Sequence, residues 1–180
     1  MLSLHFIAGV LVPFFLDWGG ITFTRIMILQ SFFVFSTFLL EVPTGAVADL
    51  TGRKTSLACA AVATSAGALV YSSFPHFYIF LVGEFLWALG YALLSGADEA
   101  LVYDTLKMMN AESQSKKIFS RFTSFQLGAI MVGAPLGSVI AAVFGLRYTM
   151  MVMAVPLFSA FFVALTFTEP ASEKKGKKTI

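Results

Sequence analysis

The chain has 180 residues, of which 58% are hydrophobic and only 12% are charged, and its formal net charge is +2. Soluble domains carry about 25% charged residues, and a soluble protein of this size could not cover so much apolar surface. The mean hydropathy of +0.84 indicates the same, so we expect a protein whose solvent is the lipid bilayer. The sequence shows no nucleophile–base pattern, phosphate-binding loop, paired metal ligands or nucleic-acid-binding patch. We therefore expect no enzyme activity, cofactor, metal or nucleic-acid partner.

Six apolar segments follow one another along the chain, and a membrane-spanning helix needs about 20 mostly apolar residues. Runs of this length indicate helices rather than the alternating strands of a membrane barrel. The first segment is short, because about 15 residues rising ~1.5 Å each cover only ~22 Å of a ~30 Å hydrocarbon core. We expect either that the natural start lies further upstream or that tilted neighbours compensate. The sequence thus predicts an all-α membrane protein with one six-helix domain over residues 1–168, its segments being 2–16, 26–48, 55–73, 77–103, 118–144 and 147–167.

Basic residues gather in alternate connections between these segments. One side of the predicted bundle carries only Arg25 and Arg147. Cytoplasmic loops carry an excess of Lys and Arg. We therefore expect the connections at 49–54 and 105–117, the tail at 169–180 and both termini to be cytoplasmic, in a multi-pass protein of the plasma (inner) membrane. The basic residues on that side are Arg53, Lys54, Lys107, Lys116, Lys117, Arg121, Lys174, Lys175, Lys177 and Lys178.

The stretch GAVADLTGRKTSL, residues 45–57, places charges and glycines between the second and third segments. Gly52 permits a tight turn, Gly45 permits close helix packing, and Asp49 can pair with Arg53 or accept from the amino end of a facing helix. A solvated loop that only sets the topology is the alternative. The pattern G-x-x-x-D-x-x-G-R-K resembles the signature loop of the major facilitator superfamily, with Leu50 where that family usually has a basic residue. The residues that match are Gly45, Asp49, Gly52, Arg53 and Lys54.

The resemblance implies a conformational latch. In the resembled family this loop braces the outward-open state against the second half of the transporter, and an acid at the cytoplasmic end of the fourth helix often joins it; Asp104 stands in that place. Family members usually have twelve spans, in two six-helix halves of two inverted three-helix repeats each. The chain would be the amino-terminal half, with the lysine-rich residues 169–180 as the start of a linker. Gly145 and Arg147 after the fifth segment echo Gly52 and Arg53 after the second.

The fifth segment carries small residues and a proline in QLGAIMVGAPLGSVI. Such residues let two helices approach and bend, so a general helix-packing motif is one interpretation. The other is a partial match to the antiporter signature of the resembled family, which would indicate export. The residues concerned are Gly128, Gly133, Pro135 and Gly137.

Ionisable residues inside spans cost about 2.5–3.5 kcal/mol each on insertion scales, which makes them functional candidates. Glu84, Tyr91 and Asp98 are spaced by seven residues and drift by about 20° per step on a helix, so they form one predicted stripe. Glu99 is offset by about 60° from that stripe, whereas Asp104 is rotated by about 200° from Glu84 and belongs to another surface.

This stripe has two open interpretations. In the resembled family the first and fourth helices line the central cavity, which implies that Glu84, Tyr91, Asp98 and Glu99 form a path for protons and substrate. A carboxylate in such a cavity could load and release a proton. Alternatively, Asp98 and Glu99 lie at a wet interface and pair with basic residues of the neighbouring connection, namely Lys107, Lys116 or Arg121.

Together these features predict a secondary transporter that works by alternating access, with proton-coupled efflux of a small molecule as the leading hypothesis. The partners implied are the bilayer, a small-molecule substrate, protons and a second six-helix half. Uptake by a symporter or facilitator of the same superfamily is one alternative. A non-transporting six-helix assembly or regulatory protein, or an inactive half, is the alternative from another class.

Overall fold

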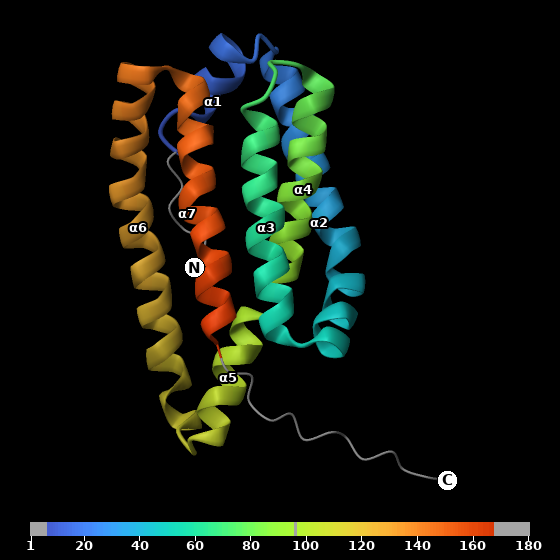
Figure 1. Cartoon of the computed structure of the whole chain (residues 1–180), viewed down its shortest axis with the longest axis vertical. Coiled ribbons are helices and arrows are strands. Elements are labelled where there is room, and N and C mark those ends of the chain that lie inside the picture. Colours follow the sequence, from blue (N-terminus) through green and yellow to red (C-terminus); the bar gives the residue numbers. More distant parts are fainter. Residues whose placement is uncertain (1–6, 96, 168–180) are drawn as a thin grey trace.

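The computed structural model describes residues 7–95 and 97–167, and every regular element within these ranges is a helix (Figure 1). The predicted fifth and sixth segments, 118–144 and 147–167, correspond to long helices, and the second and third do as well. The elements are α1 (Leu11–Pro13), the π-helix η1 (Phe14–Trp18), α2 (Phe23–Thr51), α3 (Arg53–Tyr71), α4 (Phe77–Ser95), α5 (Asp98–Met108), the 3-10 helix η2 (Glu112–Gln114), α6 (Ser115–Phe144) and α7 (Leu146–Thr166).

Four stretches of the described chain are long and apolar enough to cross a membrane: Phe23–Thr51, Phe77–Met108, Glu112–Phe144 and Leu146–Thr166. Helix α3 has a comparable length but is rich in Ala, Ser and Thr. It packs against α4, α7 and α2, so most of its surface faces protein rather than lipid. Small residues suit such a central helix because they let backbones approach closely.

Close approach of α3 and α4 depends on glycines at their contact. A Cβ built on Gly90 of α4 would lie 2.4 Å from the Thr64 Cγ2 atom and 3.0 Å from the Ala60 carbonyl oxygen of α3. The Ser56 hydroxyl of α3 also donates to the Leu93 carbonyl of α4 over 2.8 Å. On the other side of α3, the Ser65 hydroxyl donates to the Ala154 carbonyl of α7 over 3.1 Å. Hydrogen bonds and close packing thus join α4, α3 and α7 into one layer.

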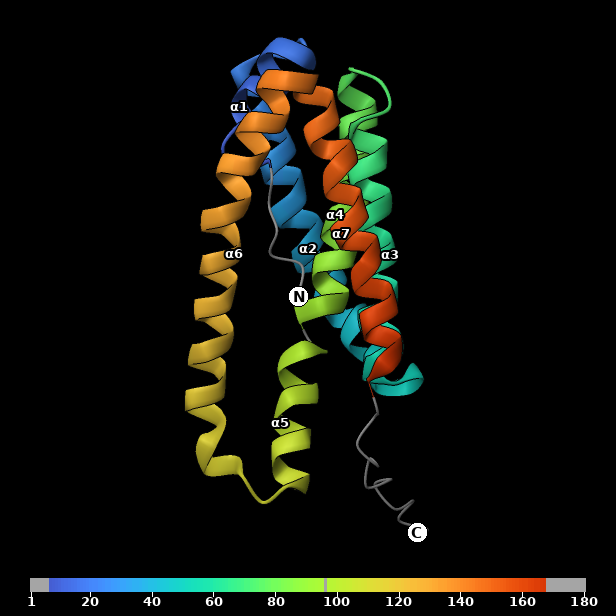
Figure 2. The same cartoon turned by 60° about the vertical axis from the view of Figure 1, so that its left-hand side comes forward.

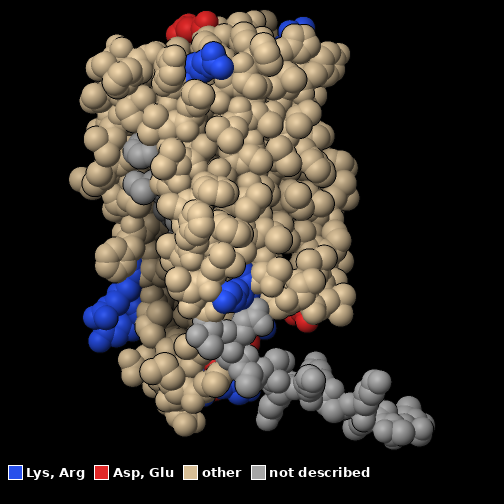
Figure 3. Space-filling model, viewed as in Figure 1, with Lys and Arg blue, Asp and Glu red and all other residues tan. Residues whose placement is uncertain are grey.

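Helix α6 lies at the edge of the bundle beside α7, away from α2 and α4, as the two views agree (Figures 1 and 2). The surface between the two ends of the molecule is almost free of charged residues in the space-filling view, and Lys, Arg, Asp and Glu gather toward the ends (Figure 3). This distribution is the one expected of a protein surrounded by hydrocarbon at its middle.

The chain ahead of α2 forms an aromatic layer over one end of the bundle. Phe14 and Phe15 of η1 are buried, and both rings contact Tyr71 of α3 and Phe80 of α4. The predicted first segment, 2–16, falls only partly within the described residues, where regular helix begins at Leu11 and continues to Trp18. Residues 169–180, the predicted tail, lie outside the described residues.

The predicted fourth segment, 77–103, is divided between α4, which ends at Ser95, and α5, which begins at Asp98. Ala97, which precedes α5, has φ −98° and ψ −38°. Residue 96, between the two helices, lies outside the described residues, so the common stripe of Glu84, Tyr91 and Asp98 stays a prediction.

Two turns of the bundle share one backbone conformation. Gly52 joins α2 to α3 with φ +95° and ψ 149°, and Gly145 joins α6 to α7 with φ +100° and ψ 159°. Positive φ is readily adopted only by glycine. Each turn follows a long helix with an internal proline, Pro43 in α2 and Pro135 in α6. The similarity that the sequence suggested between these two connections therefore extends to their geometry.

Candidate functional site

An ion pair joins the turn after α2 to helix α5. The Arg53 Nη1 atom lies 2.7 Å from the Asp104 Oδ2 atom, and the two side chains are 28% and 42% exposed. Gly52 permits the turn that places Arg53 at the first position of α3, and α5, which follows α4, carries Asp104 at the same end of the molecule. The two residues that the family resemblance assigned to one cluster thus lie in contact.

The other charged residues of the loop flank this pair along the chain. Asp49 is exposed near the end of α2, and Lys54 is partly buried at the start of α3. Asp104, rather than Asp49, is the acid that pairs with Arg53. A Cβ on Gly45 would meet no atom within 4 Å in the described part of the chain, so Gly45 serves no close packing there.

We expect the Arg53–Asp104 pair to contribute modestly, because partly exposed ion pairs are worth at most about 1 kcal/mol. In a double-mutant cycle of Arg53→Gln and Asp104→Asn, thermal unfolding in detergent should give a coupling free energy of about 0.5–1 kcal/mol. Asp104→Asn combined with Arg25→Gln, at the opposite end of α2, should be additive. Additive effects of the Arg53 and Asp104 changes would contradict the pairing.

A second cluster is built around Glu84, whose side chain is only 5% exposed. The Gln30 Nε2 atom of α2 donates to the Glu84 Oε1 atom over 3.3 Å. Tyr71 at the end of α3 lines the same cavity as Glu84. Neutral side chains from two other helices therefore surround a carboxylate inside the bundle.

A cavity of about 190 Å³ opens beside this carboxylate. Aromatic and aliphatic side chains surround it, and Glu84 is the only acid among the described residues that line it. The lining comes from the chain before α2 and from α2, α3, α4 and α7, including Phe15, Gln30, Phe33, Tyr71, Trp87 and Met150. The cavity is therefore contained within this bundle.

The remaining residues of the predicted path lie elsewhere. Tyr91 is 51% exposed, and its ring contacts Phe33 of α2 at a centroid distance of 6.0 Å. Asp98 is partly buried, Glu99 is exposed, and the Glu99 backbone N–H donates to the Asp98 Oδ1 atom over 2.7 Å. The structure thus brings Asp98 and Glu99 together at the start of α5, and Glu84 belongs to a separate site.

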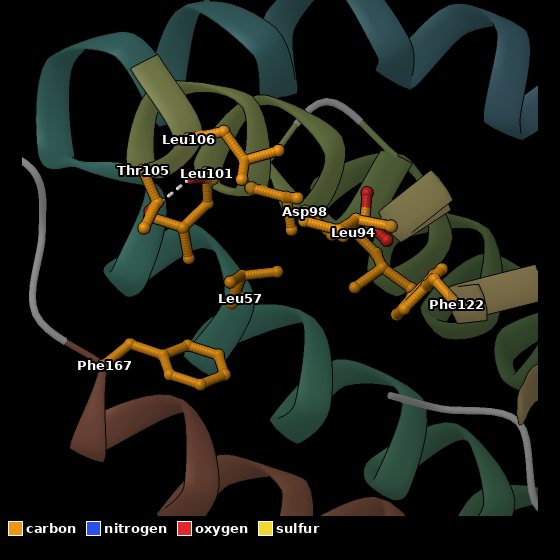
Figure 4. A pocket seen from close by; sticks show the side chains of 10 residues that line it. Leu57, Leu94, Asp98, Leu101, Thr105, Leu106, Phe122 and Phe167 are labelled. Atoms are coloured by element: carbon orange, nitrogen blue, oxygen red, sulfur yellow. Dashed lines mark hydrogen bonds between the residues drawn. The ribbon is translucent and has the colours of Figure 1, made fainter. Parts of the chain in front are cut away.

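Asp98 borders a larger cavity of about 450 Å³ between α3, α5 and α6 (Figure 4). Aliphatic and aromatic side chains dominate the lining of this cavity. Among the described residues that line it, Asp98 is the only charged one. Asp98 and Phe167 lie on opposite sides of the cavity in this view, with Leu57 between them.

The predicted packing motif of the fifth segment lies on two faces of α6. Gly133 and Gly137 are buried, whereas Gly128 and Pro135 are exposed. The chain ahead of α1 crosses α6 here, because a Cβ on Gly9 would lie 2.9 Å from the Ser138 Oγ atom and 3.2 Å from the Ala134 carbonyl oxygen.

Sequence reasoning singled out Glu84 but not its partners. Gln30 carried a usable signal, since it is a polar residue within the apolar run IMILQSFF. Tyr71 and the aromatic residues that line the cavity carried no such signal, because aromatic residues are abundant in lipid-facing helices. Only the packing of η1 against α3 and α4 brings these rings together.

Comparison with known proteins agrees with the helical architecture and the membrane-spanning stretches. No curated protein matches the chain. The profile of the Major Facilitator Superfamily matches residues 1–180. Members of this family are membrane transporters, and the chain belongs to the major facilitator superfamily.

Proposed function

We propose that this protein is a proton-coupled secondary transporter that exports a small molecule by alternating access. The observation that carries the proposal is the Glu84 carboxylate, which is buried beside a cavity inside an apolar bundle. Burying an acid inside a membrane bundle costs free energy, and intramembrane acids mark ion and substrate pathways. The family supplies the class of transporter, and Glu84 supplies a residue able to carry a proton.

The proposal includes six spans arranged as two three-helix repeats. The two turns at Gly52 and Gly145 support it, because they share one conformation and follow helices of 29 and 30 residues. In this arrangement α2 and α6 occupy equivalent positions.

The proposal also assigns a conformational latch to Gly45, Asp49, Gly52, Arg53, Lys54 and Asp104. The ion pair between Arg53 and Asp104 supports it. The end of α2 around Gly45 is open, with Leu50 86% exposed. A second six-helix half would cover this face in one state and leave it in the other. The latch and both termini would then lie on the cytoplasmic side of the plasma membrane, as the distribution of basic residues predicts.

Proton movement would begin at Glu84 and continue toward the cytoplasm past Tyr91, Asp98 and Glu99. Around Glu84, α2 contributes Gln30 and α3 contributes Tyr71. The neighbouring elements also carry charged groups at the end of the bundle that is nearer to Glu84. Asp17 is exposed on η1, and Arg25 stacks on the Phe77 ring at 5.5 Å. The Arg147 Nε atom donates to the Ser72 carbonyl.

Export is favoured over uptake by the partial match of Gly128, Gly133, Pro135 and Gly137 to the antiporter signature of the family. The test uses purified protein in vesicles of both orientations, with a pH-sensitive dye inside. Under an imposed pH gradient, small organic cations should dissipate the gradient in exchange for protons. Entry of protons together with the compound would indicate uptake instead. An unchanged gradient for every compound would contradict proton-coupled transport and favour a non-transporting role.

A further inference from the structure

We propose that the cavity beside Glu84 binds a small methylated ammonium ion. This inference rests on the proposed transport function, because it names the substrate class of the same site. It places the binding site inside this six-helix bundle, on residues that all belong to the chain itself.

The charge of the ligand follows from the acid at the cavity wall. Glu84 is 95% buried, since only 5% of its surface is exposed, and its neighbours on α2 and α3 are the neutral side chains of Gln30 and Tyr71. A buried carboxylate that is ionised needs a cation nearby to offset its loss of water. A monovalent cation in the cavity meets this need.

The methylated character of the ligand follows from the other walls. Phe15, Phe33, Tyr71 and Trp87 line the cavity, and the Tyr71 and Trp87 rings meet edge to face at 6.3 Å. Aromatic faces attract organic cations, and quaternary ammonium groups are recognised in this way. A ligand with many N–H donors would find few acceptors, because Glu84 and Gln30 carry the only side-chain carboxylate and amide oxygens among the described residues that line the cavity.

A metal ion fits this cavity poorly. Calcium takes about 6–8 oxygen ligands, and magnesium requires near-octahedral oxygen coordination. Glu84 and Gln30 offer only one carboxylate and one amide. Within residues 7–95 and 97–167, no three His, Cys, Asp or Glu side chains come together as a metal site.

The size of the ligand follows from the volume of about 190 Å³. Each water occupies about 30 Å³ of liquid, so the cavity has the volume of roughly six waters. Pockets for drug-sized ligands begin at about 300 Å³. The ligand is therefore a compact ion such as choline rather than a large lipophilic cation.

Binding is measured by the fluorescence of Trp87 in a Trp18→Phe background, which leaves Trp87 as the only tryptophan of the chain. The protein is titrated in lipid nanodiscs with choline and with 3,3-dimethyl-1-butanol, which has the same shape without the charge. Choline should change the emission and bind about tenfold or more tightly than the alcohol, a difference of about 1.4 kcal/mol. Calorimetry with the unaltered chain should give the same ratio.

Glu84→Gln should weaken choline binding about tenfold or more and leave binding of the alcohol unchanged. Glu41→Gln is the matched control, because Glu41 is an exposed acid on another spanning helix. Equal affinity for choline and the alcohol, or choline binding that survives Glu84→Gln, would overturn the proposal. The comparison of the two ligands uses the unaltered binding site, so it remains decisive if Glu84→Gln does not fold.

The vesicle assay separates this inference from the proposed function. If other compounds exchange with protons and choline does not bind, the substrate class is wrong and the transport function stands. If choline binds with the expected selectivity and no compound moves protons, the site is correct and proton-coupled transport is wrong.

Discussion

Replacing Gly90 with leucine is expected to leave no folded protein. A Cβ at this position of α4 would already lie 2.4 Å from the Thr64 Cγ2 atom and 3.0 Å from the Ala60 carbonyl oxygen. The backbone of α3 cannot yield as a flexible side chain would, so α3 and α4 must separate. Gly90→Ala, with one added carbon, should lower the free energy of unfolding by about 1–3 kcal/mol. Size-exclusion profiles and thermal unfolding in detergent measure both effects.

Gly128→Ala is the matched control for this prediction. Gly128 also lies inside a helix, but a Cβ there would meet nothing within 4 Å. Alanine restricts the unfolded chain more than glycine does, so this change should be neutral or stabilising by up to about 1 kcal/mol. Equal destabilisation by Gly90→Ala and Gly128→Ala would show that α3 and α4 are not in the close contact described.

Replacing Glu84 with glutamine is expected to abolish proton-coupled transport while the protein remains folded. Glutamine keeps the size of the side chain and can still accept from Gln30, but it cannot take up and release a proton. Vesicles carrying Glu84→Gln should therefore keep an imposed pH gradient as long as vesicles without protein do. The thermal midpoint should be equal or higher, because the cost of a buried charge is removed.

This pair of readouts separates a coupling role from a structural one. If Glu84 only supports packing, Glu84→Gln should lower the thermal midpoint and flux together. Glu41→Gln, on the exposed surface of α2, should change neither. Asp98→Asn tests the other end of the proposed path: a loss of flux would extend the path to α5, and normal flux would limit it to Glu84.

The long apolar helices and the contact between Arg53 and Asp104 were predictable from sequence. Long apolar runs require internally hydrogen-bonded backbone in a bilayer, which identifies helices without knowledge of their packing. The contact of Arg53 with Asp104 followed from the family resemblance, which placed Asp104 in the same cluster, whereas the loop alone suggested Asp49 as the partner of Arg53. Gly52 was recognisable from its position between two apolar runs, and its positive φ explains why glycine stands there.

The break between α4 and α5 and the environment of Glu84 were not predictable in the same way. Helical periodicity treats residues 77–103 as one cylinder, whereas α4 ends at Ser95, α5 begins at Asp98, and Asp98 lines a different cavity from Glu84. Burial of Glu84 depends on contacts with Gln30 and Tyr71, which lie on other helices. Such contacts arise from tertiary packing and leave no periodic signal in a single sequence.

The position of helix α3 inside the bundle was also not predictable from the sequence. Its Ala, Ser and Thr residues make it less apolar than its neighbours, and it is not among the four described stretches that are apolar enough to cross a membrane, although the sequence predicted a span at 55–73. Its central position between α4 and α7 explains this composition, because Ser56 and Ser65 donate to carbonyls of adjacent helices. A helix shielded from lipid can be both small and polar, and only the fold shows which helix is shielded.

The most direct test of exchange between proton and substrate at Glu84 is to count the protons that purified protein releases in weakly buffered detergent solution. The compound added is the one that gives the strongest flux in vesicles. If proton and substrate compete for Glu84, binding of one must displace the other by the same coupling. We expect release of about one proton per bound substrate from the unaltered chain and none from Glu84→Gln. Equal release from both proteins, or none from the unaltered chain, would contradict exchange at Glu84.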